Sequence, residues 1–423
     1  MIRKEIFGGI IRMAALVMIM SMLAGACSKN DGPEDNGDNT EQPSKPGEGD
    51  NQGDNGSGDG SGSGSEGGSG DNGEGGGNGS GEGNEGEGGG NEGGQPTDPD
   101  KPQVAATNWM TLLDDNTKVA LLTIPGTHDA ATSTCAGPGK CQTLTISGQL
   151  EHGVRAFDLR PTMDNNTTLG NIYHSILDTG VSMGDAMEYF DSFLKAHPGE
   201  GIIVIMRYES ERQILGSIAE DNYKTAMKNF LWDSRIYQSR MAAFNKSMTM
   251  KDLRGKILII SRNDLSPVST FETASTQWSH SNSVGEALQI YGTGGLGRIY
   301  VQDMYSAEKN GNSSEADFLA KKKELVCKLL DITVPFREYE QNNWVINYCS
   351  GYAGSSFASD SYAKNAASTN PAALEHIQAH TGKGFTGIVM MDYAGTDTYE
   401  VGGSTFSVSG KSLTEALIMN NFQ

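Results

Sequence analysis

The sequence contains few of the residues that build metal centres or bind nucleic acids. Five of its 423 residues are cysteines, and none of them has the spacing of a metal-binding motif. Its 32 lysines and arginines are outnumbered by 53 aspartates and glutamates, so it lacks the basic excess typical of proteins that bind nucleic acid. No glycine-rich phosphate loop and no dinucleotide-binding fingerprint follows its first apolar run. These absences argue against nucleic-acid partners and against the commonest nucleotide-binding folds.

Long apolar runs are scarce as well, and the most prominent one stands near the start of the chain. Basic residues precede the stretch Met13–Leu23, which is too short for a comfortable membrane span, and small residues lead from it to Cys27. This pattern is typical of a secretory signal, and its end resembles a bacterial lipoprotein signal, in which the cysteine becomes the lipidated first residue. We predict a signal peptide over residues 1–27 with lipidation at Cys27; the alternative is an ordinary cleaved signal that removes this cysteine.

Residues 28–103 contain almost no apolar side chains and consist mainly of Gly, Ser, Asn, Asp and Glu. Such a segment cannot bury a core, so we predict a disordered acidic linker. It carries most of the formal net charge of -21, which leaves the remainder only mildly acidic. We expect one folded domain over residues 104–423, tied to the outer membrane of a Gram-negative cell envelope. The acidic run Asp31–Asp38 resembles the export signals of some surface lipoproteins; whether the domain faces the periplasm or the exterior stays open.

Short continuous apolar runs recur through the folded part, each consistent with a strand buried on both faces. Capped helical patterns, such as the one that begins at Ser182-Met-Gly-Asp185, lie between several of them. Strands that alternate with helices favour a parallel sheet, and eight strands favour a closed one. We therefore predict an α/β fold, a single irregular (β/α)8 TIM-type barrel. Its expected strands are Val119–Ile124, Val154–Leu159, Asn171–His174, Ile202–Met206, Ile257–Ile260, Ile299–Gln302, Trp344–Tyr348 and Ile388–Met391.

Polar and charged residues follow nearly every expected strand, at the end where barrels of this kind carry their active sites. They are His128 and Asp129, Asp158 and Arg160, His174, Arg207 and Glu209, Arg262, Asp303 and Tyr305, Asn347, and Asp392 and Tyr393. Two histidines with arginines suit phosphoryl transfer, because one imidazole can accept a proton while the other donates one and a guanidinium neutralises phosphate oxygens. A Ca²⁺ or Mg²⁺ site would want more clustered carboxylates, and Arg160 stands where such a cluster would form. We predict no metal and no cofactor.

Three motifs together resemble the X domain of bacterial phosphatidylinositol-specific phospholipases C. They are Ile124-Pro-Gly-Thr-His-Asp129, Gln149-Leu-Glu-His-Gly-Val-Arg-Ala-Phe-Asp-Leu-Arg160 and Tyr173-His174. The likeness continues in Gly255–Arg262, Val301–Tyr305 and Gly387–Asp392, and so covers essentially all of residues 104–423. The resemblance implies a distorted TIM barrel. It also implies attack of the inositol 2-hydroxyl on phosphorus, which releases diacylglycerol and inositol 1,2-cyclic phosphate.

The resemblance also implies a role for each catalytic position. By motif position, His128 is the expected general base and His174 the expected general acid, while Arg160 binds the phosphate where calcium-dependent members carry an acidic residue. Asp392 is expected to orient His128, and Asp129 to assist the acid step.

The remaining positions are expected to support or bind. Asp158 would support the phosphate-binding arginine and the second histidine. Arg262 and Asp303 would hydrogen-bond inositol hydroxyls, Tyr305 would face the ring, and Arg207 falls where bacterial relatives usually have lysine. The plainer alternatives are that the two arginines form ordinary ion pairs and that the tyrosine packs against the barrel rim.

Several points stay open at the level of sequence. The chemistry fits phosphatidylinositol or a related inositol phospholipid as the partner, but also glycosylated inositol phospholipids of the protein-anchor type. A third alternative, a non-catalytic inositol or glycan binder, has no use for a second histidine. Cys135 with Cys141, and Cys327 with Cys349, are possible disulfides in an exported protein. We expect a monomer that reaches the membrane surface through its lipid anchor.

Overall fold

The computed structural model describes residues 104–210, 218–265, 269–271, 286–291, 297–306, 314–338, 343–356, 358–381 and 385–423. The chain divides into two units, Met1–Asn91 and Glu92–Gln423, and every described residue belongs to the second. The predicted signal peptide, the lipidation site and the acidic linker lie outside the described residues. Among the helices that are described, none is both long enough and apolar enough to span a bilayer.

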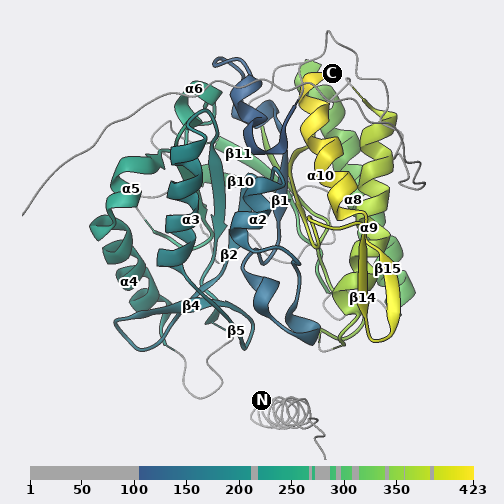
Figure 1. Cartoon of the computed structure of the whole chain (residues 1–423), viewed down its shortest axis with the longest axis horizontal. Coiled ribbons are helices and arrows are strands. Elements are labelled where there is room, and N and C mark those ends of the chain that lie inside the picture. The colour runs from purple at the N-terminus through teal and green to yellow at the C-terminus, as the bar shows by residue number, and fades with distance from the viewer. Residues whose placement is uncertain are drawn as a thin grey trace, which may run out of the picture. The chain divides into compact units, whose positions relative to one another are not determined.

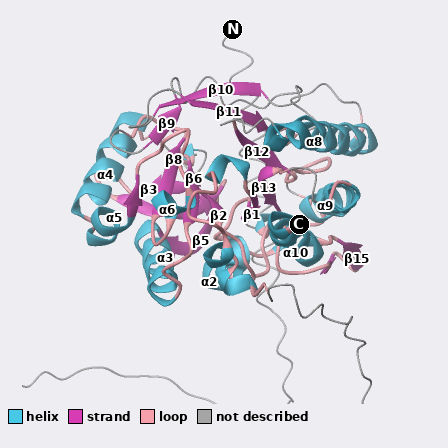
Figure 2. Ribbon diagram, turned by 90° about the horizontal axis from the view of Figure 1, so that it is seen from above, coloured by secondary structure: helices cyan, strands magenta, loops and turns pink. Residues whose placement is uncertain are grey.

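A closed ring of strands forms the centre of the described unit (Figures 1 and 2). The pairing order is β6-β2-β1-β13-β12-β11-β10-β9-β8-β7, and β6 also pairs with β8, which closes the ring. Neighbours are parallel except at β10, which is antiparallel to both β9 and β11. The predicted irregular TIM-type barrel is thus confirmed. The strands are β1 (Thr123–Thr127), β2 (Ala156–Leu159), β6 (Ile202–Met206), β7 (Met241–Ala242), β8 (Ile257–Ser261), β9 (Ser269–Phe271), β10 (Glu286–Tyr291), β11 (Gly297–Gln302), β12 (Trp344–Tyr348) and β13 (Gly387–Met391).

The side chains of the parallel strand β6 enter two different apolar clusters in alternation. In β6, Ile203 and Ile205 join the cluster that also holds Trp109 and Trp344, inside the ring. The residues between them, such as Val204, join the cluster that holds the apolar faces of the surrounding helices. Every residue of β6 is therefore buried, which explains why the strand reads as an unbroken apolar run.

Helices surround the ring on its outside, except α6, whose Met250 and Leu253 join the inner cluster (Figure 2). The helix α3 shows why they form: Ser182 Oγ accepts the backbone N–H of Asp185, and the Asp185 carboxylate accepts the backbone N–H of Ser182. Its apolar face, with Met187 and Phe190, then packs into the outer cluster. The helices are α2 (Ile146–Glu151), α3 (Met183–Ala196), α4 (Glu220–Asp233), α5 (Arg235–Arg240), α6 (Met250–Leu253), α8 (Glu315–Glu338), α9 (Ser361–Ala379) and α10 (Gly410–Met419).

The first strand lies further along the chain than the apolar run Val119–Ile124 predicted. Residues Val119–Leu121 form a short 3-10 helix, and β1 runs through Pro125 and Gly126 instead of stopping there. Gly126 is needed for close packing rather than for a turn, because a Cβ atom at this position would lie 2.4 Å from Met390 Sδ. The strand therefore reaches up to the residue before His128.

The segment Asn171–His174 was predicted to be a strand of the barrel, and this prediction is wrong because the strand lies outside the ring. It belongs to β4 (Leu169–His174), which pairs antiparallel with β3 (Pro161–Met163) and β5 (Leu177–Ser182) in a separate three-stranded sheet. Its side chains are only alternately buried along its first half, as befits a strand with one covered face. The ring is completed instead by β9 and β10, which the sequence did not predict. A further hairpin, β14 (Thr398–Val401) and β15 (Ser404–Ser407), stands apart from both sheets.

Candidate active site

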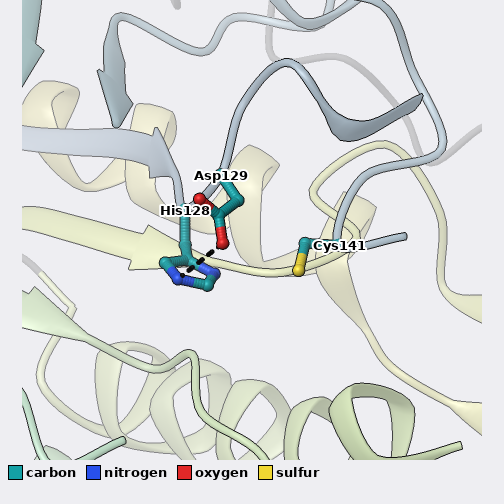
Figure 3. Close-up of side chains that lie close together, drawn as sticks. All are labelled: His128, Asp129 and Cys141. Atoms are coloured by element: carbon teal, nitrogen blue, oxygen red, sulfur yellow. Dashed lines mark ion pairs between the residues drawn. The ribbon is translucent and has the colours of Figure 1, made fainter. Parts of the chain in front are cut away.

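His128 is fixed at the carboxyl end of β1. Its backbone N–H donates to the carbonyl of Met391 in β13, and its own carbonyl accepts from the side-chain amide of Gln142. The next residue, Asp129, adopts a left-handed conformation with φ of 44°. This turn brings the Asp129 carboxylate back to the imidazole, with Oδ2 3.2 Å from His128 Nε2 (Figure 3).

The other nitrogen of this imidazole contacts Asp392, which follows the neighbouring strand β13. The distance from His128 Nδ1 to Asp392 Oδ1 is 2.9 Å, and the carboxylate is fully buried. A proton on Nδ1 is therefore donated to Asp392, and Nε2 keeps its lone pair. Burial lowers the pKa of His128, and the positive charges of Arg160 and His174 lower it further. The geometry is that of a neutral imidazole able to accept a proton at Nε2.

His174 comes to the same place from outside the ring, at the end of β4. Its Nδ1 contacts the carbonyl of Gly139 at 3.0 Å, and its Nε2 lies 3.4 Å from Asp129 Oδ2 and 3.0 Å from the Tyr362 hydroxyl. The two imidazole rings are 6.5 Å apart between centroids. Protonated His174 thus has an acceptor for each of its N–H groups, and Nε2 is the one that faces His128 and Asp129.

Arg160 lies between three carboxylates. Its Nε is 3.0 Å from Asp129 Oδ1, its Nη2 is 2.8 Å from Asp158 Oδ2, and its Nη1 is 3.9 Å from Glu209 Oε2. Burial alone would lower the pKa of this guanidinium, but the surrounding carboxylates raise it well above its ordinary value. A permanent positive charge therefore stands beside both imidazoles.

A second group of charged residues lies at the ends of β6, β8 and β11. Arg207 Nη2 lies 2.9 Å from Glu209 Oε2, and Arg262 Nη1 lies 3.9 Å from Asp303 Oδ2. Burial lowers the pKa of Arg262 to about 10, and the charge of Arg207 acts in the same direction. Arg207 has the more exposed side chain, 28% against 13%. Tyr305 lies near Tyr352, with ring centroids 6.3 Å apart and planes inclined by 49°. All ten residues predicted for the site are therefore found at the carboxyl end of the barrel.

Three further residues complete this site: Glu209, which was expected at this end of the barrel without a role of its own, and two tyrosines that the sequence did not single out. Glu209 links the two groups, since its Oε2 contacts Arg207 at 2.9 Å and Arg160 at 3.9 Å. Its position three residues beyond the end of β6 is the signal that placed it among the polar residues expected here. The hydroxyl of Tyr362 in α9 and the ring of Tyr348 in β12, 6.2 Å from that of His128, had no such signal.

Lys322 is a buried cation beneath this end of the barrel. It lies in α8, is fully buried, and its Nζ donates to Gln302 Oε1 at 3.1 Å. Burial lowers the pKa of Lys322 to about 8, against the opposing charges of Asp303 and Asp392. Its own charge lowers the pKa of His128. Lys322 therefore acts on the imidazole through the electric field rather than by contact.

Three groups could ligate a metal ion here: His128, Asp129 and Cys141 offer atoms within 4.8 Å of one another (Figure 3). The fit is poor, because Arg160 already neutralises Asp129 and burial raises the pKa of the Cys141 thiol well above its ordinary value. Cys141 and the other described cysteines, Cys135, Cys327 and Cys349, carry free thiols. The disulfides left open by the sequence are therefore not formed in this structure.

Comparison with known proteins gives related sequences. The chain is 26% identical over 299 residues to a 1-phosphatidylinositol phosphodiesterase of Staphylococcus aureus (strain Newman), covering 68% of this chain and 88% of that protein. It is 37% identical over 172 residues to a protein of the same name from Listeria monocytogenes, covering 39% of this chain and 51% of the relative. No protein-family model matches the chain.

Solved structures share the fold. A double mutant of the phosphatidylinositol-specific phospholipase C from S. aureus superposes with a TM-score of 0.59 and 25% identity, covering 75% of this chain and 97% of that one. Fold and site together define an α/β barrel with two histidines and an arginine at the carboxyl end of its strands. With these relatives beside it, the chain is similar in sequence and fold to the bacterial phosphatidylinositol-specific phospholipases C.

Proposed function

We propose that this protein cleaves the phosphodiester bond of phosphatidylinositol, releasing diacylglycerol and inositol 1,2-cyclic phosphate. One observation carries the proposal: the Nε2 atoms of His128 and His174 lie 3.2 and 3.4 Å from the same oxygen of Asp129, whose other oxygen contacts Arg160. A base, an acid and a fixed positive charge are thereby gathered around one point. Intramolecular attack on phosphorus needs this set.

His128 serves as the general base. Its Nε2 takes the proton of the inositol 2-hydroxyl while the oxygen bonds to phosphorus, and Asp392 stabilises the imidazolium that forms. The support lies in the 2.9 Å contact at Nδ1 and in the burial that lowers the pKa of His128, so that the imidazole is neutral before the reaction.

His174 serves as the general acid. It donates the proton on Nε2 to the glycerol oxygen as the phosphorus–oxygen bond breaks, which completes the exchange and leaves diacylglycerol. The Gly139 carbonyl and the Asp129 carboxylate support this role, because they lie 3.0 Å from Nδ1 and 3.4 Å from Nε2 and so orient the ring with Nε2 toward His128 and Asp129.

Arg160 neutralises the non-bridging phosphate oxygens, where negative charge increases in the transition state. Asp158 and Asp129 hold the guanidinium in place. The second group of charged residues, Arg207, Arg262 and Asp303, together with Tyr305, binds the inositol ring and its hydroxyls. The charge at Arg160 takes the role that a divalent cation would otherwise have, so the reaction is metal-independent.

The domain works from the cell envelope, as a lipoprotein anchored through Cys27 in the outer membrane of a Gram-negative bacterium. The signal pattern of residues 1–27 and the long linker of residues 28–103 support this location, and the linker gives the domain reach toward a lipid surface. Protease treatment of intact cells tests the external face. A Cys27→Ser variant tests the anchor, since it should leave the membrane fraction.

Phosphorus NMR of the reaction products tests the proposed chemistry. Purified protein with phosphatidylinositol vesicles should give the signal of a five-membered cyclic phosphodiester before any inositol monophosphate. The proposal fails if the only product is phosphatidic acid, or if phosphatidylcholine is cleaved equally well. A parallel assay that measures cleavage of a glycosylated inositol phospholipid shows whether the enzyme prefers this glycolipid or unmodified phosphatidylinositol.

A further inference from the structure

A second cluster of ligating side chains lies at the opposite end of the barrel. Asp331 belongs to the second half of α8, and His376 and His380 lie at the end of α9, close before β13 begins. The two helices pack against each other (Figure 1). One ligating atom from each of the three side chains lies within 4.8 Å of the other two. The proposed active site uses none of these residues.

The spacing of the two histidines places them on one face of α9. They are four residues apart, which is one helical turn, and their rings stack with centroids 4.2 Å apart and planes inclined by 25°. Asp331 reaches them from the neighbouring helix, with its Oδ1 2.7 Å from His376 Nε2. A His-x3-His pair with one further donor is a common zinc-binding arrangement.

His380 is held in the form that coordinates a metal. Its Nδ1 contacts the backbone carbonyl of His376 at 2.8 Å, so that nitrogen carries the proton and Nε2 keeps its lone pair. In zinc sites, the histidine nitrogen that does not bind the metal usually donates its N–H to a carbonyl or carboxylate, which fixes the orientation of the ring. The ion pair with Asp331 explains the position of His376 alone, and leaves the second imidazole stacked on it without a role.

We propose that Asp331, His376 and His380 form a binding site for a transition-metal dication, Zn²⁺ in the first place, with water as the fourth ligand. Two imidazoles and one carboxylate suit zinc, whereas calcium and magnesium prefer oxygen ligands alone. Zinc ligands bond at about 2.0–2.2 Å, so the three donors must approach one another by rotamer changes. Asp331 can make this movement, since its side chain is 62% exposed.

The bound ion would join α8 to α9 where both helices approach the strands β12 and β13. A small hollow beside the two histidines, lined also by Leu330, Ile377 and Phe385, shows that the packing here is not complete. Because the ion would bind the folded chain and not the unfolded one, zinc should raise the unfolding temperature in proportion to the logarithm of its concentration.

Isothermal titration of the full chain without a histidine tag, using ZnCl2, tests the site. We expect one bound Zn²⁺ per chain. The zinc affinity should fall more than about 100-fold in His376→Ala and in His380→Ala, because losing a ligand weakens metal binding more than losing a residue that only hydrogen-bonds to a ligand. Cobalt should give the visible absorption of a tetrahedral ion. The matched control is His152→Ala. His152 also contacts the carbonyl four residues earlier through Nδ1, but belongs to no such cluster in the described part of the chain.

Zinc could also bind at the other group of possible ligands, which is Cys141 with His128 and Asp129. The Cys141→Ser variant distinguishes the two sites, because it should leave zinc binding at Asp331, His376 and His380 unchanged. Zinc binding that survives loss of both histidines, or that disappears in Cys141→Ser, would overturn the proposal. Should either alanine variant fold poorly, Asp331→Asn keeps the test decisive, since removal of this exposed carboxylate must still weaken binding. Lipid cleavage by the His376 and His380 variants should equal that of the unaltered chain.

Discussion

The rings of His128 and His174 stand nearly perpendicular to each other, at an interplanar angle of 80°, with their centroids 6.5 Å apart. One oxygen of Asp129 lies close to Nε2 of both, and it has no hydrogen-bond partner in the structure. Burial raises the pKa of Asp129, although Arg160 opposes the rise. The oxygen is therefore placed to hold a proton between two rings whose roles we propose to be opposite.

Replacement of the two histidines should separate the two half-reactions. His128→Ala and His174→Ala should each lose about 10²–10⁴ in rate on phosphatidylinositol, as removal of an acid or a base does. An aryl phosphodiester, whose leaving group needs no proton, should restore most of the rate to His174→Ala and none to His128→Ala. Release of the aryl alcohol measures both, with His152→Ala as the unaffected control. Equal rescue of the two variants would contradict the assigned roles.

The pH dependence should show a neutral base at unusually low pH. Because burial and nearby cations lower the pKa of His128 below its ordinary 6.5, kcat/KM should begin to rise below that pH. Lys322→Met removes one of those cations, so the pKa of His128 should rise and the acid limb should move to higher pH. The pKa of Lys322 is about 8, so the difference should fade above that value.

The control for this shift is the neighbouring Lys321, which is paired with Glu324 on the outer side of α8. Lys321→Met should leave the pH profile in place. An unchanged acid limb in Lys322→Met, with normal folding by circular dichroism, would show that the buried charge does not reach His128.

Chelation should not affect activity, and loss of the guanidinium should. Arg160→Gln should lower kcat by about 10²–10³, the usual cost of one group that stabilises the charge of a transition state. Arg160→Lys keeps the charge without the two-pronged contacts to Asp129 and Asp158, and should recover only part of the rate. Initial rates with and without EDTA test the first statement; a dependence on added calcium would refute it.

The family motif also contains a residue that we expect to act on stability alone. Arg155 is fully buried, and its Nε contacts Glu200 Oε2 at 2.9 Å. Glu200→Gln leaves this guanidinium without a counter-charge and should cost about 3–5 kcal/mol in the free energy of unfolding. Chemical denaturation measures the loss, with the exposed Lys195→Met as control. Cleavage per folded molecule should not change, since Glu200 precedes β6 at the end away from the site.

The sequence predicted the parallel part of the barrel because those strands are buried on both faces. The strands Ile202–Met206 and Trp344–Tyr348 have the predicted ends, since every residue of both is buried and all but Asn347 are apolar or aromatic. The antiparallel β10 was missed because Glu286–Tyr291 lacks an unbroken apolar run. The strand at His174 was misplaced because an apolar segment indicates burial but not the sheet to which the strand belongs, and β4 pairs with β3 and β5 instead of joining the ring.

The candidate site was largely predictable for a related reason. Parallel strands bring their carboxyl ends together, so the polar residues that follow them meet without any knowledge of tertiary contacts. Tyr362 and Lys322 escaped prediction because they come from helices, whose inward-facing positions depend on how each helix is rotated against the ring. Cys141 escaped because its thiol reaches His174, 4.0 Å away, through a loop without regular structure.

The appended sheet that bears His174 is a separate piece of architecture from the ring that bears His128. Residue Tyr173 of this sheet is joined to the carbonyl of Arg160, so the appendage is aligned at the point where phosphate is expected. The acid that we propose for the leaving alcohol, His174, and the base that we propose for the nucleophile, His128, are therefore carried by different sheets. The sheet β3-β4-β5 can therefore change in evolution to suit bulkier lipids or glycolipids without any change in the ring, where close packing leaves no room for a side chain at Gly126.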